Sequence, residues 1–176
     1  IVLSGKALYA GISNYDAATS LRAMEIMDDL GVPLVINQSR YSIFDRRAEQ
    51  EGLTSLNQES KLGLITFSPL AQGLLTDRYL NGIPADSRVR TDGRFLKESQ
   101  VGEARLQQIR RLNEVAQARG QSLAAMALAW ILADNKAASV LIGASKPEQI
   151  LDNLKAVENT LFTAEELKLI DEISLA

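Results

Sequence analysis

Short apolar runs alternate with amphipathic segments along the chain, and this pattern gives the first indication of its fold. The runs at residues 7–12, 34–38, 63–67 and 138–142 are continuous rather than alternating, which is typical of parallel strands covered on both faces. Between the first two, residues 17–30 carry apolar side chains near helical spacing and are followed by a glycine and then a proline, which commonly end helices. The pattern therefore predicts strands that alternate with helices.

The rest of the chain predicts further helices and one long loop. Residues 68–98 are rich in Gly, Pro, Asp and Arg, and so long a loop inside a compact domain is usually functional or disordered. Ser122 and the capping-box sequence at residues 163–166 mark two helix starts. We expect an exposed helix at residues 47–60 and further helices at 104–119, 122–134, 147–157 and from the capping box to about 174.

This order of elements predicts an α/β fold built on a parallel sheet with right-handed crossovers. Two architectures fit it, an open doubly wound sheet or half of a (β/α)8 barrel. A complete barrel needs roughly 250 residues, so four strand–helix units in 176 residues would form about half of one. The chain starts at Ile1 without the features of a signal peptide, and its first residues are typical of a turn after a preceding helix. We therefore expect one domain that belongs to a longer protein.

The composition excludes several kinds of site. The chain contains no cysteine and no histidine, so it has no disulfide, no thiolate nucleophile and no Ser-His-Asp triad of its own, and we expect no metal site. A net charge of −3 gives no electrostatic basis for nucleic-acid binding. No apolar run approaches the roughly 18 residues of a membrane span. We expect a cytoplasmic protein that binds neither nucleic acid nor a membrane.

Polar or turn-forming residues follow each predicted strand. They are Ser13 and Asn14 after the first strand, Gln38 at the end of the second, residues 68–70 after the third and residues 143–146 after the fourth. In both architectures function gathers at the carboxyl ends of the strands. The amides of Asn14 and Gln38 suit a planar carboxamide. The last turn, which opens a helix, suits a phosphate, because backbone N–H groups and the helix dipole would face it.

Each of these residues also has a purely structural interpretation. Asn14 suits the cap of the following helix, Gln38 suits a bond to a barrel neighbour, and Gly143 and Ser145 are ordinary turn residues. The arginines of the long loop are typical of solvated charges. No Gly-x-Gly-x-x-Gly follows the first strand, so the dinucleotide-binding fingerprint of a Rossmann domain is absent.

Four motifs at these strand ends, taken in order, resemble those of the aldo-keto reductase family. They are residues 11–15 (GISNY), 37–38 (NQ) with Tyr41, 67–76 (FSPLAQGLLT), and 140–149 (VLIGASKPEQ) with Asp152 and Asn153. The loop at residues 79–88 (YLNGIPADSR) resembles the branch that holds bacterial glyceraldehyde-3-phosphate reductases and potassium-channel β-subunits. The resemblance implies strands five to eight of a (β/α)8 barrel, so that residues 1–176 would be its C-terminal half, with the N-terminal half missing.

The resemblance also implies an NADP(H) site made of residues from all four strand ends. Phe67 falls where the family stacks an aromatic ring on the nicotinamide, and Phe keeps the stacking face. Gln149 stands where other branches place Arg, and Lys146 partly compensates with its charge. By position, the carboxamide would contact Ser13, Asn14 and Gln38; the pyrophosphate would contact Ser68, Leu70 and Gly73; Arg78 and Arg88 would bind phosphate from the loop; Gly143, Ser145 and Lys146 would meet the 2′-phosphate; and Gln149, Asp152 and Asn153 would contact it or the adenine.

The resemblance implies that no catalytic residue lies in this chain. The family's proton donor is a tyrosine supported by Asp, Lys and His, and all four belong to the first half of the barrel. The implied function of the parent protein is an NADP(H)-dependent reductase of aldehydes or ketones, with a small aldehyde such as glyceraldehyde 3-phosphate or methylglyoxal as a candidate substrate.

Two other functions are open alternatives. An NADP(H)-binding regulatory subunit, like a potassium-channel β-subunit, would use the same cofactor residues. A flavodoxin-like regulator would need acidic residues after the first strand, and residues 11–15 have none. A half barrel would also expose unpaired strand edges. We therefore expect the chain to associate with the missing half or with another copy of itself.

Overall fold

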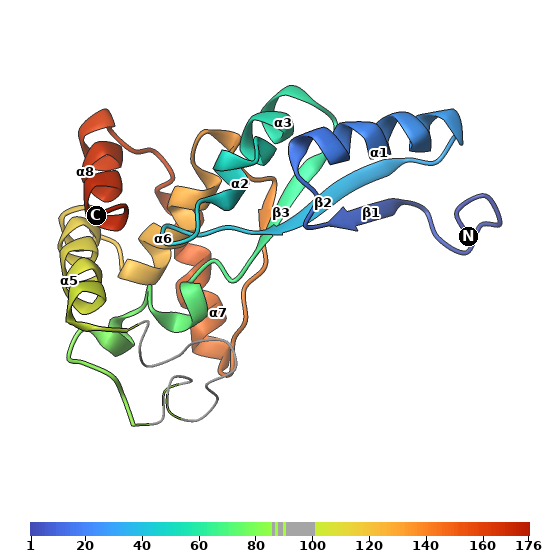
Figure 1. Ribbon diagram of the computed structural model, residues 1–176. Coiled ribbons are helices and arrows are strands. Elements are labelled where there is room, and N and C mark those ends of the chain that lie inside the picture. Colours follow the sequence, from blue (N-terminus) through green and yellow to red (C-terminus); the bar gives the residue numbers. More distant parts are fainter. Residues whose placement is uncertain (86, 88–89, 91–100) are drawn as a thin grey trace.

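A parallel sheet of four strands is the frame of the molecule (Figure 1). The computed structural model describes residues 1–85, 87, 90 and 101–176. Neighbours in the sequence are neighbours in the sheet, with the order β1-β2-β3-β4 and every pairing parallel. The strands are β1 (Ala10–Ser13), β2 (Leu34–Arg40), β3 (Gly63–Phe67) and β4 (Ser139–Val140).

The order of the strands separates the two architectures that fit the sequence. A doubly wound sheet reverses its strand order at a switch point, whereas this sheet runs from β1 to β4 without reversal. In Figure 1, α1 (Ala17–Asp29) and α3 (Leu53–Glu59) lie over one side of the sheet, and no helix of the described residues covers the opposite side of β1 and β2. The expected parallel α/β fold is confirmed, and a sequential order with helices on one side is typical of a (β/α)8 barrel sheet.

The remaining helices follow the predicted order with shifted ends. The helix predicted at residues 47–60 is instead two helices, because Gly52 takes a left-handed φ of 74° between α2 (Arg47–Gln50) and α3. The long loop after β3 contains the 3-10 turns η1 (Ala71–Gly73) and η2 (Asp77–Tyr79). The other elements are α5 (Glu103–Ala118), α6 (Leu123–Leu132), η4 (Ala133–Asn135), α7 (Pro147–Leu154), η5 (Lys155–Glu158) and α8 (Ala164–Ser174).

The helix side of the sheet is well packed. Asn37 of β2 and Leu64 and Thr66 of β3 are buried there. The side-chain amide of Asn37 donates to the carbonyl oxygen of Tyr15 (2.8 Å) and to the hydroxyl of Ser20 (3.0 Å). These bonds tie β2 to the start of α1, so the buried amide is a structural link and not a binding group.

The opposite side of the sheet, which we call the open face, carries the alternate residues of each strand. Strand register pairs Arg40 with Phe67, so both side chains lie on that face. Gly11 is needed there, because a Cβ at this position would lie 2.8 Å from Cγ1 of Ile36. The sequence predicts cover on both faces, and within the described residues no helix lies over the open face of β1 and β2. The open face comprises Gly11, Ser13, Ile36, Gln38, Arg40, Gly63, Ile65, Phe67 and Ser139.

The core lies on the helix side, where α5, α6 and α8 pack beside α2 and α3. Trp130 of α6 is buried at its centre, with its ring centroid 5.1 Å from that of Tyr41 and 4.0 Å from the Cζ atom of Arg46. Ala48 of α2 and Leu53 of α3 are buried as well, so this pair of helices is not the exposed helix that the sequence predicted. Many of its polar residues are exposed, whereas Thr54 is buried, and Ala48 and Leu53 join the core.

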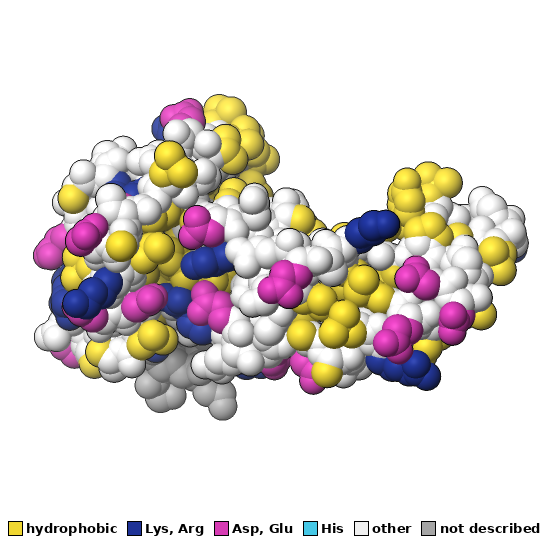
Figure 2. Space-filling view, turned by 90° about the horizontal axis from the view of Figure 1, so that it is seen from above, with side chains coloured by type: hydrophobic (Ala, Val, Ile, Leu, Met, Phe, Trp, Pro, Cys, Tyr) yellow, Lys and Arg dark blue, Asp and Glu magenta, His cyan; other side chains and the backbone are white. Residues whose placement is uncertain are grey.

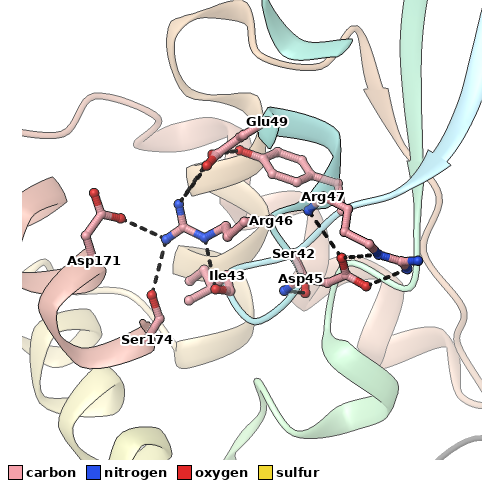
Figure 3. Close-up of polar contacts among 9 residues, drawn as sticks. Ser42, Ile43, Asp45, Arg46, Arg47, Glu49, Asp171 and Ser174 are labelled. Atoms are coloured by element: carbon pink, nitrogen blue, oxygen red, sulfur yellow. Dashed lines mark hydrogen bonds and ion pairs between the residues drawn. The ribbon is translucent and has the colours of Figure 1, made fainter. Parts of the chain in front are cut away.

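The Arg46 guanidinium joins α8 to the segment that follows β2 (Figure 3). It donates to the Ile43 carbonyl oxygen and to the Glu49 carboxylate within its own segment. It also donates to the Asp171 carboxylate (2.8 Å) and the Ser174 hydroxyl (3.2 Å) of α8. Because the Arg46 side chain is 8% exposed, these acceptors take the place of water around a buried charge.

Replacing Arg46 with Met should lower the free energy of unfolding by about 2–4 kcal/mol, because two carboxylates and a buried hydroxyl lose their shared donor. Arg47→Met is the matched control, since the Arg47 side chain is 60% exposed and pairs with Asp45 at the surface. We expect that control to cost less than about 1 kcal/mol. Urea unfolding followed by circular dichroism measures both, and equal losses would contradict a central role for Arg46.

Candidate functional site

The carboxyl ends of β1 and β2 bring three predicted residues together. The backbone N–H of Asn14 donates to the carbonyl oxygen of Gln38 (2.9 Å), and the hydroxyl of Ser13 donates to the same oxygen (3.0 Å). The amide of Asn14 donates in turn to that hydroxyl at 3.1 Å. The side-chain amide of Gln38 is half-buried on the open face and has no hydrogen-bond partner within the described part of the chain. A carboxamide group is the kind of ligand that can pair with such an amide.

Asn14 does not cap the helix after it. The cap of α1 is Asp16, whose carboxylate accepts from the backbone N–H of Thr19 at 2.7 Å. Hydrogen bonds from the side chain and the backbone of Thr19 hold the pKa of Asp16 below its usual value. Asn14 instead has a φ of 59°, in the left-handed region that few residues other than glycine adopt. Its side chain therefore stays at the strand end, where its amide donates to the Ser13 hydroxyl.

The turn after β3 is tightly wound. Ser68, Ala71 and Gln72 have φ values of 54°, 47° and 60°, all in the left-handed region. The amide of Gln72 donates to the hydroxyl of Ser68 at 3.1 Å, which orients that hydroxyl. Each such residue costs on the order of 1 kcal/mol, and strain of this kind clusters at ligand sites. Phe67, the residue before the turn, is half-buried on the open face.

The other two predicted residues of this turn, Leu70 and Gly73, make contacts within the fold itself. Leu70 packs against the core, and its carbonyl oxygen accepts from the backbone N–H groups of Gly73 and Leu75. Gly73 has a φ of 95°, a conformation that suits glycine alone. The N–H of Gly73, expected to face a pyrophosphate, therefore donates inside the turn.

The chain after β4 forms a small turn around the side chain of Gln149. The Gln149 side-chain oxygen accepts from the N–H of Ser145 (2.8 Å), the hydroxyl of Ser145 (3.2 Å) and the N–H of Lys146 (3.2 Å). Gly143 and Lys146 are exposed beside it. An oxygen held by three donors at the N-terminus of α7 occupies the position that an anionic oxygen would take. The structure thus brings Ser145, Lys146 and Gln149 together at this turn.

The remaining predicted residues are more scattered. Asp152 pairs with Lys155 on the exposed side of α7, with 2.8 Å between the carboxylate oxygen and the ammonium nitrogen. Asn153 is half-buried next to it, and Arg78 is exposed on η2. Arg88 lies outside the described residues.

Arg40 was not predicted from the sequence, although its place two residues after Gln38 on a strand is a signal that both share one face. Its Cζ atom lies 5.8 Å from the centroid of the Phe67 ring. A hollow of about 170 Å³, which we call the β1–β2 hollow, is lined by Asn14, Ser39, Arg40, Arg47 and Glu51.

A larger hollow, of about 340 Å³, lies between α6 and α7. Among the predicted residues only Asp152 borders it, and the groups gathered at the strand ends do not. Its buried Arg119 is engaged by the Glu166 carboxylate (2.6 Å), by Gln121 and by two backbone carbonyl oxygens. These contacts hold α5 to the start of α8, and they leave the strand ends as the better candidate site.

Tyr41, which follows β2 directly, is not available as a proton donor. Its ring is fully buried, and its hydroxyl donates to the Glu49 carboxylate. Burial and that carboxylate raise the pKa of Tyr41 well above its usual value, so the hydroxyl keeps its proton. Within the described ranges, no group of acidic residues could hold a metal ion, and no helix is long and apolar enough to cross a membrane.

Comparison with known proteins identifies the family of this chain. Residues 1–175 match the family model described as the aldo/keto reductase family. The L-glyceraldehyde 3-phosphate reductase of Escherichia coli K12 is 47% identical over 174 residues, which cover 97% of this chain and 50% of that protein. A putative voltage-gated potassium channel subunit beta of Schizosaccharomyces pombe is 35% identical over 178 residues, covering 98% and 52% of the two chains.

A solved structure agrees with the family match. The crystal structure of a thermostable aldo-keto reductase with the inhibitor epalrestat superposes with a TM-score of 0.68 at 27% identity, covering 98% of this chain and 50% of that one. The chain thus spans about half the length of the relatives that it matches. The family resemblance read from the four motifs is confirmed, and this chain belongs to the aldo/keto reductase family.

Proposed function

We propose that this chain is the cofactor-holding C-terminal half, strands five to eight, of an NADP(H)-dependent aldehyde or ketone reductase. Aldo-keto reductases generally use NADH or NADPH. The observation that carries the proposal is the gathering of Ser13, Asn14 and Gln38 at the carboxyl end of the sheet. The three-donor turn around Gln149 follows the last strand at the same end.

The residues at β1, β2 and β3 fit a nicotinamide. The half-buried amide of Gln38 has both a donor and an acceptor to offer, and Asn14 stands beside it in a left-handed conformation. Phe67 offers a flat apolar face for stacking. The bound cofactor would supply the hydride, while these residues would bind and orient its ring. Ser68, Leu70 and Gly73 would then lie along the pyrophosphate, with Arg78 and Arg88 contributing from the loop.

The turn after β4 fits a phosphate. The donors of Ser145 and Lys146 that now meet the Gln149 oxygen would bind the 2′-phosphate after this side chain turns away. The exposed ammonium of Lys146 adds a positive charge that a 2′-phosphate can use and a 2′-hydroxyl cannot. Gln149, Asp152 and Asn153 would then border the phosphate or the adenine. This difference in charge supports NADP(H) over NAD(H).

The proposed substrate is a small aldehyde, such as glyceraldehyde 3-phosphate or methylglyoxal. The name of the Escherichia coli relative, L-glyceraldehyde 3-phosphate reductase, supports this class. The proton donor would come from the other half of the barrel. A second candidate function is an NADP(H)-binding regulatory subunit, which the 35% identity to the Schizosaccharomyces pombe channel subunit supports.

We also propose that the open face is covered by a second half barrel, either the missing half or another copy of this chain. Among the residues that the structure describes, β1 and β4 each have a partner strand on one side only, so their outer edges carry unpaired backbone groups. Figure 2, which looks onto the α1 side of the sheet, shows hydrophobic side chains on the right-hand lobe, which holds α1 and the N-terminal segment. Exposed apolar residues near the two edges are Leu8, Tyr9, Leu21, Ile26, Leu30, Leu141, Ile142, Ile150, Leu151, Leu154 and Val157.

On its own, the chain should form dimers or larger species, because the open edges and apolar side chains favour pairing over exposure. Multi-angle light scattering after gel filtration measures the mass. Leu8→Lys should shift the distribution toward monomer, since Leu8 is 78% exposed beside β1. Leu169→Lys on α8, where the residue is 39% exposed, should leave it unchanged. A stable monomer of the unaltered chain would contradict the proposal.

The chain should bind NADPH, seen as a change in nucleotide fluorescence, and should bind NADH more weakly. Lys146→Met should weaken NADPH binding by about tenfold, equivalent to about 1.4 kcal/mol, and leave NADH nearly unchanged. Gln149→Glu should act in the same direction, because a carboxylate would hold the same donors and repel the phosphate. Lys168→Met is the control, since Lys168 is 79% exposed on α8. Equal losses for both nucleotides would argue against a 2′-phosphate site at this turn.

A further inference from the structure

Arg40 is the one charged residue among those of the open face. It ends β2, two residues after Gln38, and its register partner is Phe67 of β3. Its guanidinium therefore lies at the carboxyl end of the sheet, on the side where the nicotinamide is proposed to bind. A cation on an otherwise uncharged face is suited to bind an anionic group there.

The guanidinium of Arg40 is less engaged than those of its neighbours. Arg47 binds both carboxylate oxygens of Asp45, at 3.0 and 2.9 Å. Arg46 is saturated by acceptors from its own segment and from α8. Arg40 approaches Asp45 only at 4.0 Å and donates no side-chain hydrogen bond to any described residue. Most of its five N–H groups are therefore available to a ligand.

Asp45 neutralises Arg40 only in part, because its carboxylate is hydrogen-bonded to Arg47. Burial raises the pKa of Asp45, but the hydrogen bonds and charge of Arg47, together with the charge of Arg40, outweigh it and hold that pKa below its usual value. Asp45 is thus ionised and is hydrogen-bonded chiefly to Arg47. The N–H groups along the edge of the Arg40 guanidinium remain available. Glu51 also borders the β1–β2 hollow, from the exposed end of α2. Binding there would depend on the directed donors of Arg40, because the local formal charges balance.

We propose that Arg40 is an anion-binding residue of the substrate pocket, and that the carbonyl compound bound beside it carries a phosphate or a carboxylate. A planar guanidinium with a free edge suits both groups, because each presents paired oxygens at matching spacing. The β1–β2 hollow of about 170 Å³ lies between the ends of these strands and α2, and Arg40 borders it from the open face. The hollow has room for a small anionic group. This inference rests on the proposed cofactor site, since that site would place the reacting carbon near the same strand ends.

The test is a titration of inorganic phosphate into the isotope-labelled chain, followed by nuclear magnetic resonance of backbone amides and arginine Nε–H groups. The signals of Arg40 and of residues 38–41 should shift with one common affinity. Arg40→Met should weaken phosphate binding at these signals by about tenfold or more. Arg22→Met is the control, because Arg22 is 72% exposed and paired with Glu25 on α1, and it should change nothing.

Phosphate bound at the turn around Gln149 is distinguished by its own signals, those of Ser145 and Lys146, and by Lys146→Met. Acetate should displace phosphate from Arg40 if the site accepts both kinds of anion. Phosphate binding with no response at Arg40, or an equal loss in Arg22→Met, would overturn the proposal.

A parallel NADPH titration separates this proposal from the cofactor site. Arg40→Met should keep the NADPH affinity within about twofold. A tenfold loss of NADPH affinity in that variant would assign Arg40 to the cofactor's pyrophosphate and overturn the substrate assignment. Failure of the unaltered chain to bind NADPH, with the phosphate response at Arg40 intact, would count against the proposed function and leave the anion site standing.

Discussion

A parallel sheet packs stably when both of its faces are covered, and the described helices of this chain leave the open face of β1 and β2 uncovered. The two faces therefore differ in chemistry. On the helix side the polar side chain of Asn37 is tied to neighbouring groups and acts as structure. On the open face the amide of Gln38 and the guanidinium of Arg40 keep most of their bonding capacity. The proposed ligand binding and the proposed association with another half barrel would both follow from this one-sided cover.

Contacts on the helix side stabilise the strand ends that carry the groups of the open face. Arg46 fixes the segment after β2 against α8 and Trp130, and this segment begins directly after Arg40. At the neighbouring strand ends, the left-handed residues Asn14 and Ser68 turn the chain sharply where the predicted cofactor groups stand. Such turns cost free energy, and a well-packed layer behind them keeps them in place.

The sequence predicted much of this arrangement, because strong local signals carry it. Apolar continuity located β2 and β3, and the strand-end motifs identified the family. The break at Gly52 was missed, since an isolated glycine inside a polar helical pattern is also tolerated in an unbroken helix. Arg40 was missed because a charged residue at a strand end is usually exposed to solvent. Only the strand register, which pairs it with Phe67, shows which face of the sheet it lies on. The position of the Gln149 side-chain oxygen at the turn after β4 depends on the side-chain rotamer, and sequence spacing does not reveal a rotamer.

The central claim is that NADP(H) lies along the carboxyl ends of these strands. Intermolecular nuclear Overhauser effects between NADP⁺ and the isotope-labelled chain test it most directly. We expect nicotinamide protons to contact the ring of Phe67 and the amide of Gln38, and adenine protons to contact Asn153. Contacts instead to Ser122 and Lys155, which line the larger hollow between α6 and α7, would contradict the account.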